Sequence, residues 1–298
     1  MRLHPPGGVD GLTLDEVESP APGLGEALVQ VRAAAITRDE LTWPVDRLPA
    51  IPSYELSGVV AGIGPGVDVV AIGDACYGLT PFDRDGVAAE YATVPAELLA
   101  PKPHTLDDVA AAALPLAALS AWQGLFEHGG LEQNDRVLIT GALGGVGHLA
   151  TQLARWRGAH VIASAADADA DGARDLGAAE VVDPSSFDLS LEPVDLVFDT
   201  AGADVLRRAM TIVRAGGRLV SVAEEPSTPT EIDGSFFIVE PNRAQLLEIT
   251  RLVEHGDLLP AIDAVFPVVD AKAAFARSME RGKRGKVVLR VTDEAIDG

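Results

Sequence analysis

Cysteine is almost absent from this sequence. Cys76 is the only one among 298 residues, which excludes an intrachain disulfide and a cysteine-rich zinc site. Long hydrophobic runs are also missing: the longest, residues 109–122, is too short to span a bilayer and contains Pro115 and Ser120. The N-terminal segment lacks the apolar stretch of a secretory signal. We therefore expect a cytoplasmic protein that does not enter membranes.

Basic residues are outnumbered by acidic ones. The chain has 23 lysines and arginines against 45 aspartates and glutamates, for a formal net charge of −22. A surface of this sign repels nucleic-acid phosphates and anionic lipids, so neither is expected as a partner. Hydrophobic residues make up 47% of the sequence, which predicts a packed globular protein, and the length suits two domains.

The texture of the sequence changes twice. Residues 1–106 are rich in proline and glycine and contain short β-like segments, which predicts a mostly-β module. Residues 107–240 alternate short apolar strands with helical segments, which is typical of an α/β doubly wound parallel sheet. Residues 241–298 open with an amphipathic helix at 241–256 and return to β-like texture, so we expect them to complete the first domain. The central strands are expected at residues 137–141, 160–165, 180–183, 196–200 and 218–222.

A glycine-rich turn follows the first of these strands. In VLITGALGGVGHLATQLAR, residues 137–155, the small positions of a G-x-G-x-x-G pattern are Ala142, Gly144 and Gly147. The middle glycine lets the backbone approach a pyrophosphate, and the last lets helix and strand pack closely. The N–H groups at the start of the helix then bind the anion. The turn therefore predicts a dinucleotide site, and a purely structural turn is the alternative.

The end of the second strand indicates which dinucleotide binds. NAD sites usually place a carboxylate about 20 residues after the turn, where it accepts a hydrogen bond from the ribose 2′-hydroxyl. Here that position is Ser164, followed by Ala165. Without a carboxylate to repel a 2′-phosphate, NADPH is favoured over NADH. The nearest basic residue is Arg174, and the aspartates within residues 167–171 oppose this interpretation unless they form the exposed start of a helix.

Six stretches of the sequence occur in an order typical of one family. They are PSYELSGVVAGIGPGVD, AAALPLAALSAW, GALGGVGHLATQLAR, DLVFDTAG, GGRLVSV and RGKRGKVVLRV. Together they resemble the medium-chain dehydrogenase/reductase superfamily, in particular its zinc-free quinone oxidoreductase (zeta-crystallin-like) branch, over nearly the whole chain. The resemblance implies a Rossmann domain in the middle and a GroES-like catalytic domain built from both chain ends. It also implies a homodimer, for which SFFIVEP is the candidate edge strand.

The same resemblance places residues around the cofactor. Contacts with the pyrophosphate are implied for Gly144, Gly145, Val146, Gly147 and Lys286. Positions near the nicotinamide are implied for Ser120, Ala201 and Phe237. Three alternatives stay open: a solvated lysine, a serine hydroxyl bonded to its own helix, and a phenylalanine in the core.

The resemblance also shows where this chain departs from zinc-dependent relatives. Those proteins ligate the metal with Cys, His and a further Cys or Glu, whereas here Thr37 stands at the first cysteine and Tyr54 at the histidine. No metal is therefore expected. Without a Lewis acid, an ordinary ketone is poorly activated toward hydride. Quinones and α,β-unsaturated carbonyls need less help, because the incoming charge delocalises into a phenolate or enolate.

The substrate pocket is expected around these substituted positions. Tyr54 is the candidate proton donor or hydrogen-bond partner of a carbonyl oxygen. Thr37 and Thr42 stand in a loop where relatives commonly have Asn and Tyr, and Trp43 adjoins them. Trp43 and Tyr77 could stack on a planar substrate, with packing in the core as the alternative for each aromatic residue.

Three hypotheses of function follow. The first is a zinc-free reductase that moves hydride from NADPH to a quinone or enone held in a dry cleft between two domains. The second is an enoyl-thioester reductase of a biosynthetic pathway. The third is a non-catalytic NADPH-binding protein, which would bind the cofactor without turnover.

Overall fold

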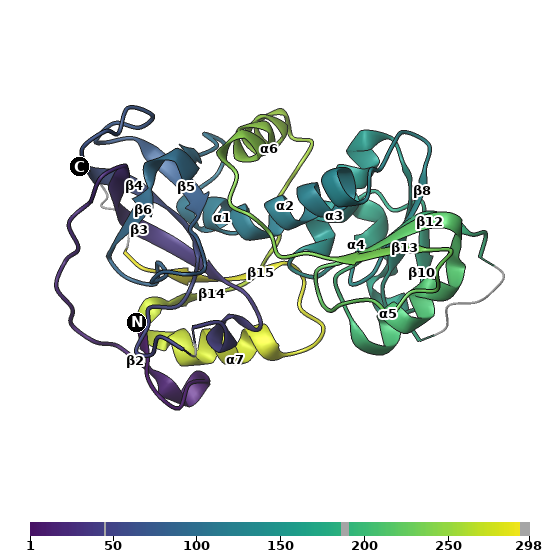
Figure 1. Ribbon diagram of the computed structural model, residues 1–298, viewed down its shortest axis with the longest axis horizontal. Coiled ribbons are helices and arrows are strands. Elements are labelled where there is room, and N and C mark those ends of the chain that lie inside the picture. Colours follow the sequence, from purple (N-terminus) through teal and green to yellow (C-terminus); the bar gives the residue numbers. More distant parts are fainter. Residues whose placement is uncertain (45, 186–190, 293–298) are drawn as a thin grey trace. The chain divides into compact units, whose positions relative to one another are not determined.

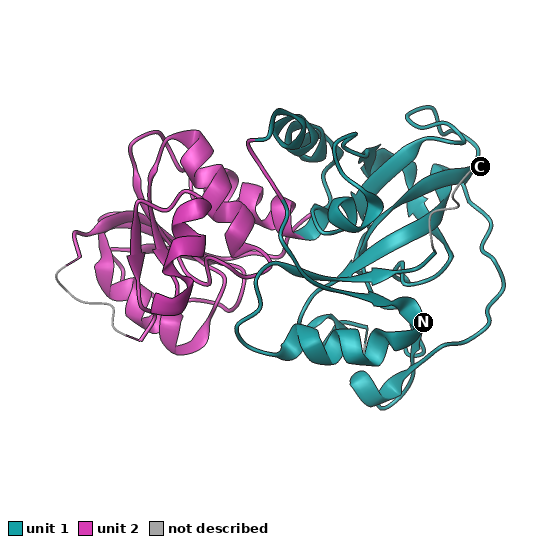
Figure 2. Cartoon of the chain, turned by 180° about the vertical axis from the view of Figure 1, so that it is seen from behind, with its two compact units in different colours: residues 1–116, 241–256, 260–298 teal, residues 117–240, 257–259 magenta. Residues whose placement is uncertain are grey.

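The computed structural model describes residues 1–44, 46–185 and 191–292 (Figure 1). They form two compact units (Figure 2). The first comprises residues 1–116, 241–256 and those from 260 onward, and the second comprises residues 117–240 and 257–259. The boundary between them lies after the expected one at 106/107. The reason is that helix α1 (Asp108–Ala112) packs Ala112 against the sheet of the first unit.

The second unit contains the predicted doubly wound sheet. Its strands are parallel and lie in the order β10-β9-β8-β11-β12-β13, so the chain runs outward from β8 in both directions. In the view of Figure 1, helices α3 and α5 cover opposite faces of the sheet. The predicted fold class is thus confirmed. The strands are β8 (Arg136–Ile139), β9 (His160–Ser164), β10 (Glu180–Val182), β11 (Val194–Asp199), β12 (Val213–Ser221) and β13 (Asp233–Phe236).

Buried aliphatic side chains hold the covering helices on this sheet. Leu138, Ile162 and Leu219 of three strands pack with Leu206 of α5 on one face. Among the described residues, no helix is both long and apolar enough to cross a bilayer. The helices are α2 (Pro115–Trp122), a π-helical segment (Gln123–His128), α3 (Gly147–Arg157), α4 (Ala170–Asp175) and α5 (Ala203–Ala209), with 3₁₀ turns at Asp167–Asp169 and Met210–Ile212.

The first unit is mostly β-structure built from both chain ends. Its main sheet has the order β14-β15-β3-β4-β5-β7, with β6 also paired to β3. The C-terminal strand β15 lies antiparallel to β3, with Val288 opposite Ala35. The strands are β1 (Arg2–Leu3), β2 (Leu12–Thr13), β3 (Glu26–Ile36), β4 (Glu55–Ile63), β5 (Ala75–Leu79), β6 (Tyr91–Pro95), β7 (Leu99–Pro101), β14 (Ile262–Pro267) and β15 (Lys286–Arg290).

Two helices complete this unit, and the first of them lies at the predicted amphipathic segment. Helix α6 (Arg243–His255) buries Leu246, Ile249, Leu252 and Val253, as the spacing indicated. Helix α7 (Ala271–Met279) packs Phe275 into a core that includes Leu289 of β15. Short 3₁₀ turns complete the unit at Val9–Gly11, Glu40–Thr42, Ala96–Leu98 and Val268–Asp270.

The start of α6 gives a test of local stability. The side chain of Asn242 accepts a hydrogen bond from the Gln245 N–H at 3.1 Å, which caps the helix. Asn242→Ala leaves that N–H without its partner, so the free energy of unfolding in urea should fall by about 1 kcal/mol. Asn242→Asp keeps an acceptor and should lose much less. Equal loss in both variants would show that the cap contributes nothing.

Candidate active site

The glycine turn joins β8 to α3 in a tight bend. Gly141 has a positive φ of 61°, and the Gly144 N–H donates to the Gly141 carbonyl at 2.9 Å. A Cβ on Gly147 would lie 2.1 Å from that carbonyl oxygen, so only glycine permits the first turn of α3 to pack this closely. A Cβ on Gly144 would lie 3.2 Å from the same oxygen. The backbone thus forms the cradle that a pyrophosphate needs at a helix N-terminus.

His148 strengthens this turn, and the sequence analysis did not identify it. Its side chain is 1% exposed, and Nδ1–H donates to the Gly144 carbonyl at 2.9 Å. The Thr151 hydroxyl donates to the Gly147 carbonyl at 2.9 Å. The sequence feature that could have identified it is its position directly after Gly147, from which an imidazole N–H can reach a carbonyl of the turn. These contacts fix the backbone of the cradle.

The end of β9 carries a buried hydroxyl without a partner. Ser164 is 3% exposed, and no group among the described residues hydrogen-bonds its Oγ. Such a hydroxyl costs free energy until it finds an acceptor or donor. Ala165 beside it is also buried, whereas Arg174 is largely exposed and pairs with Asp171 at 3.0 Å. Ser164 therefore has an unused hydrogen-bonding group for a ligand, whereas Arg174 is already paired with Asp171.

A buried carboxylate connects the carboxyl ends of three strands. Asp199 at the end of β11 has no exposed surface, and it accepts hydrogen bonds from the hydroxyls of Thr140 (2.6 Å) and Ser221 (2.8 Å). The backbone N–H groups of Ala201 and Gly202 also donate to it. This network fixes the loop that carries Ala201, an exposed residue predicted to lie near the nicotinamide.

Two other residues predicted near the nicotinamide are buried. Ser120 lies in α2 and is 3% exposed. Phe237 is 8% exposed, and its ring stacks on His128 with centroids 4.3 Å apart and planes inclined by 23°. For Phe237 the structure thus shows a packed ring, which is the core alternative. Contact of either residue with a cofactor stays a prediction.

Lys286 lies in a buried ion pair in the first unit. Its ammonium is 2.5 Å from Glu55 Oε1 and 3.2 Å from the Thr37 hydroxyl, and its side chain is 5% exposed. The other oxygen of Glu55 accepts a hydrogen bond from the Leu116 N–H at the start of α2. Lys286 is therefore not a solvated lysine. In this structure the ammonium is held by Glu55 and Thr37, and the contact with a pyrophosphate stays a prediction.

A second carboxylate lies close to this pair. Glu40 is 1% exposed, and it accepts hydrogen bonds from the N–H groups of Thr37 (2.9 Å) and Ser53 (3.1 Å). Burial raises the pKa of Glu40 to about 8, although those N–H groups and the Lys286 ammonium oppose the shift. A protonated Glu40 leaves one ammonium facing one carboxylate. The buried charges then balance.

Tyr54 lies in a cluster of three aromatic rings. Its ring centroid is 5.6 Å from that of Trp43 and 5.3 Å from that of Phe82, and those two are 5.0 Å apart. Tyr54 has no exposed surface, and burial raises the pKa of its hydroxyl, which therefore stays protonated at neutral pH. Arg47, which the sequence analysis missed, donates from Nη2 to the Tyr54 hydroxyl oxygen at 3.2 Å.

Two residues predicted to line the substrate pocket make hydrogen bonds within the first unit. Tyr77 is fully buried, and its hydroxyl bonds the Leu246 carbonyl (2.8 Å) and the Thr250 hydroxyl (2.9 Å), which ties β5 to α6. The ring is thus packed in the core, which is the alternative interpretation, and its stacking on a substrate stays a prediction. The Thr42 hydroxyl donates to the Asp39 carbonyl within its own 3₁₀ turn, at 2.7 Å.

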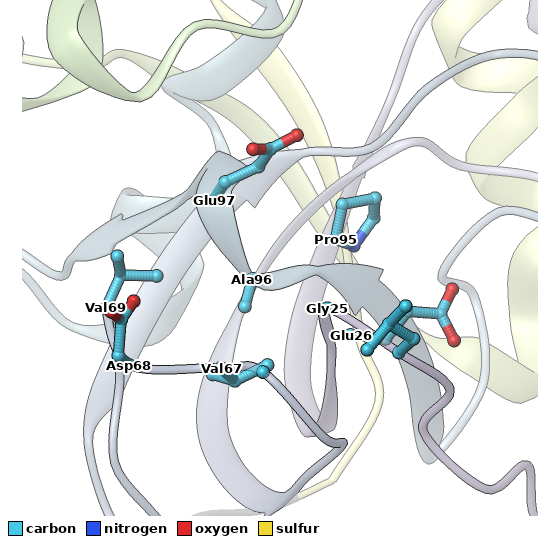
Figure 3. A pocket seen from close by; sticks show the side chains of 10 residues that line it. Gly25, Glu26, Val67, Asp68, Val69, Pro95, Ala96 and Glu97 are labelled. Carbon is cyan, nitrogen blue, oxygen red and sulfur yellow. The ribbon is translucent and has the colours of Figure 1, made fainter.

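A separate pocket is lined by residues of the first unit (Figure 3). It encloses about 440 Å³, and the carboxylate of Glu26 on its wall is paired with Arg84 at 2.7 Å. None of the predicted site residues lines it. Elsewhere in the described part of the chain, no group of three His, Cys, Asp or Glu side chains is arranged to hold a metal ion. The pocket is lined by Leu24, Gly25, Glu26, Gly66, Val67, Asp68, Val69, Pro95, Ala96 and Glu97.

Comparison with known proteins identifies relatives along nearly the whole chain. A family model described as an alcohol dehydrogenase GroES-like domain matches residues 23–104, and one described as a zinc-binding dehydrogenase matches residues 176–289. A probable zinc-binding mitochondrial oxidoreductase of Arthroderma benhamiae is 32% identical over 94% of this chain and 93% of its own length.

Two further relatives carry more specific descriptions. The NADPH-dependent alkenal/one oxidoreductase of Arabidopsis thaliana chloroplasts is 30% identical over 95% of this chain and 77% of its own. The structure of the quinone oxidoreductase from Coxiella burnetii matches with a TM-score of 0.90 at 28% identity, over 98% of each chain. The similarity therefore extends through both compact units.

The raised pKa of Glu40 gives a pH-dependent stability. Between its ordinary value of 4.5 and about 8, the folded protein keeps a proton that the unfolded chain has released. Stability should therefore fall as pH rises through this window, by up to about 1.4 kcal/mol per unit. In Glu40→Gln this contribution should vanish, so urea unfolding from pH 5 to 8 should show a flatter profile. The exposed Glu18→Gln should follow the wild type, and parallel profiles for all three would refute the assignment.

Proposed function

The chain belongs to the medium-chain dehydrogenase/reductase superfamily, within its quinone oxidoreductase branch, and we propose that it is a zinc-independent, NADPH-dependent reductase of quinones or α,β-unsaturated carbonyls. It is an oxidoreductase of the medium-chain dehydrogenase/reductase type, with a nucleotide-binding domain for a nicotinamide cofactor. The proposal rests on Thr37 and Tyr54, which stand at two positions expected to hold metal ligands in zinc-dependent members. Each of these hydroxyls accepts a hydrogen bond from a cationic side chain.

Thr37 and Tyr54 stand where zinc-dependent members have ligands. Thr37 accepts from the Lys286 ammonium, and Tyr54 accepts from the Arg47 guanidinium, each at 3.2 Å. The Lys286 ammonium is already paired with Glu55, and a divalent cation beside the Arg47 guanidinium would be repelled. Neutral hydroxyls are also poor substitutes for the thiolates and imidazoles that zinc prefers. Although two of the matched descriptions mention zinc, the residues of this chain do not fit it.

A site without a metal requires an acceptor that can delocalise the negative charge brought by the hydride. When hydride adds to the β-carbon of an enone, the C=C electron pair shifts to form the enolate double bond and the carbonyl π pair moves onto the oxygen. The resulting enolate takes a proton from water, and the same logic applies to a quinone and its phenolate. The alkenal/one and quinone oxidoreductases among the relatives support this class of substrate.

The residues of the second unit fit a dinucleotide. Gly144 and Gly147 allow the tight turn that brings backbone N–H groups to the start of α3, where a pyrophosphate would bind, and the unpartnered Ser164 hydroxyl can donate to a 2′-phosphate. Bound NADPH supplies the hydride. The chain's own contribution is to hold the pyrophosphate, to orient the loop after β11 through Asp199, and to receive the acceptor in the first unit.

We also propose a homodimer formed through the edge strand β13. This strand lies at the end of the sheet, and Phe236 (36% exposed) and Ile238 (66% exposed) leave apolar surface along the edge. An unpaired edge of this kind favours pairing with a second copy. Light scattering of the wild type and Ile238→Lys would examine it. The expected cytoplasmic location stays a prediction.

A turnover assay tests the function. Purified protein is mixed with NADPH and, in separate reactions, with quinones, enones and enoyl thioesters, while the near-ultraviolet absorbance of NADPH is followed. We expect oxidation with quinones or enones that survives treatment with a chelator. Turnover of thioesters alone would move the function to a biosynthetic enoyl reductase. Cofactor binding without turnover of any acceptor, or stoichiometric zinc in active protein, would overturn the proposal.

The cofactor preference has its own test. Ser164→Asp places a carboxylate where a 2′-phosphate would lie, so NADPH affinity should fall by about 10-fold or more, about 1.4 kcal/mol, through charge repulsion. NADH affinity should stay the same or rise, because the carboxylate can accept from the 2′-hydroxyl. Fluorescence titration measures both, and Ser164→Ala controls for loss of the hydroxyl. An unchanged ratio of the two affinities in Ser164→Asp would contradict the assignment.

A further inference from the structure

Arg47 is a guanidinium with free donors beside the candidate proton donor. Its Nη2 donates to the Tyr54 hydroxyl oxygen at 3.2 Å and to the Phe82 carbonyl oxygen at 2.5 Å. Those two bonds use both hydrogens of Nη2. The described residues give no partner to Nε–H or to the two hydrogens of Nη1, and no ion pair to Arg47. Three N–H donors therefore remain for a ligand.

The surroundings fix this cation in place. Phe82 supplies the carbonyl that anchors Nη2, and its ring contacts both Trp43 and Tyr54. Arg47 itself is partly exposed, whereas Tyr54 is fully buried. Of these two groups, only Arg47 therefore has surface that a molecule from solvent can reach. A partly buried positive charge acts at a lower effective dielectric than one in water, which strengthens its attraction for an anion.

We propose that Arg47 is the catalytic electrophile: its guanidinium contacts the carbonyl oxygen of the acceptor and stabilises the oxyanion formed as hydride adds, while Tyr54 positions it. This inference rests on the proposed function and names the group that replaces the missing Lewis acid. Bound NADPH would supply the hydride, which carries the electron pair of its broken C–H bond into the new C–H bond of the acceptor, and the cofactor would be released oxidised. The displaced π electrons would place the negative charge on the acceptor oxygen beside Arg47, and water would supply the final proton.

The kinetic test compares four variants on a neutral enone. Arg47→Met keeps an apolar stem but removes the charge, and kcat should fall by about 10²-fold, as for loss of an oxyanion donor. Arg47→Lys keeps the positive charge but loses the planar set of guanidinium N–H donors, so it should retain part of the activity. Tyr54→Phe should lose less than Arg47→Met. Arg251→Met removes a surface arginine paired with Glu248 and serves as the matched control. NADPH affinity should be unchanged in all of them.

A binding experiment gives a readout that needs no turnover. Para-nitrophenolate resembles the phenolate formed from a quinone, and para-nitroanisole is its neutral counterpart. Arg47→Met should weaken binding of the phenolate by about 10-fold or more, the contribution of a hydrogen bond to a charged group. It should leave the anisole unaffected. The binding experiment tests the role of Arg47 alone. The turnover of the wild type tests the proposed function, so the two can fail separately.

Three results would overturn the inference. The first is equal binding of the phenolate by the wild type and Arg47→Met. The second is loss of turnover in Tyr54→Phe with activity retained in Arg47→Met, because Tyr54 would then carry the step. The third is an effect confined to KM for acceptors with a fixed carboxylate, because Arg47 would then only anchor that group. Circular dichroism of each variant confirms that it is folded.

Discussion

The ion pair between Lys286 and Glu55 joins three segments that are far apart in the sequence. Lys286 opens β15, Glu55 opens β4, and the second oxygen of Glu55 receives the Leu116 N–H at the start of α2. A buried carboxylate is tolerated only when its charge is compensated. Here an ammonium and a helix N-terminus both compensate it. The unit built from two chain ends thus closes around one neutralised charge.

This arrangement has a chemical consequence. The ammonium that balances Glu55 also holds the Thr37 hydroxyl, and Glu40 receives the Thr37 N–H from the other side. A position that holds a metal ligand in zinc-dependent relatives is therefore part of a closed charge network. In the proposed zinc-independent reaction the site would still have an electrophile, because a second cation, Arg47, lies beside Tyr54. Structural charge and reactive charge are thus carried by different residues.

The cofactor half of the site could be predicted from sequence because its geometry is made by the backbone. A strand, a turn of small residues and a helix are local features, and the contact that requires glycine at position 147 comes from Gly141, six residues earlier. The alternation of strands and helices along the chain also predicted a doubly wound parallel sheet, whereas the order of its strands comes from the structure. The fold class was therefore accessible without any knowledge of side-chain packing.

The substrate half could not be predicted in the same way, because partners distant in sequence decide its side-chain positions. From the sequence, Lys286 could be a solvated lysine, and only the structure shows its ion pair with Glu55. From the sequence, Tyr77 could stack on a substrate, and only the structure shows the hydrogen bonds of its hydroxyl to Leu246 and Thr250 of α6. Arg47 gave no signal, since its role depends on a carbonyl at Phe82 and a phenol at Tyr54. Each of these residues needs the tertiary structure.

The strong negative charge of the chain constrains how a dinucleotide can bind. Its phosphates are repelled at long range by a net charge of −22, but salt screens exposed charges beyond about 8 Å at physiological ionic strength. Binding must therefore come from contacts closer than this. Backbone N–H groups at the start of α3 satisfy the condition without adding a basic side chain, and the Gly144–Gly147 cradle admits the anion to them. In a protein this acidic, a phosphate site made of backbone keeps recognition local, since no basic surface is needed to attract the ligand.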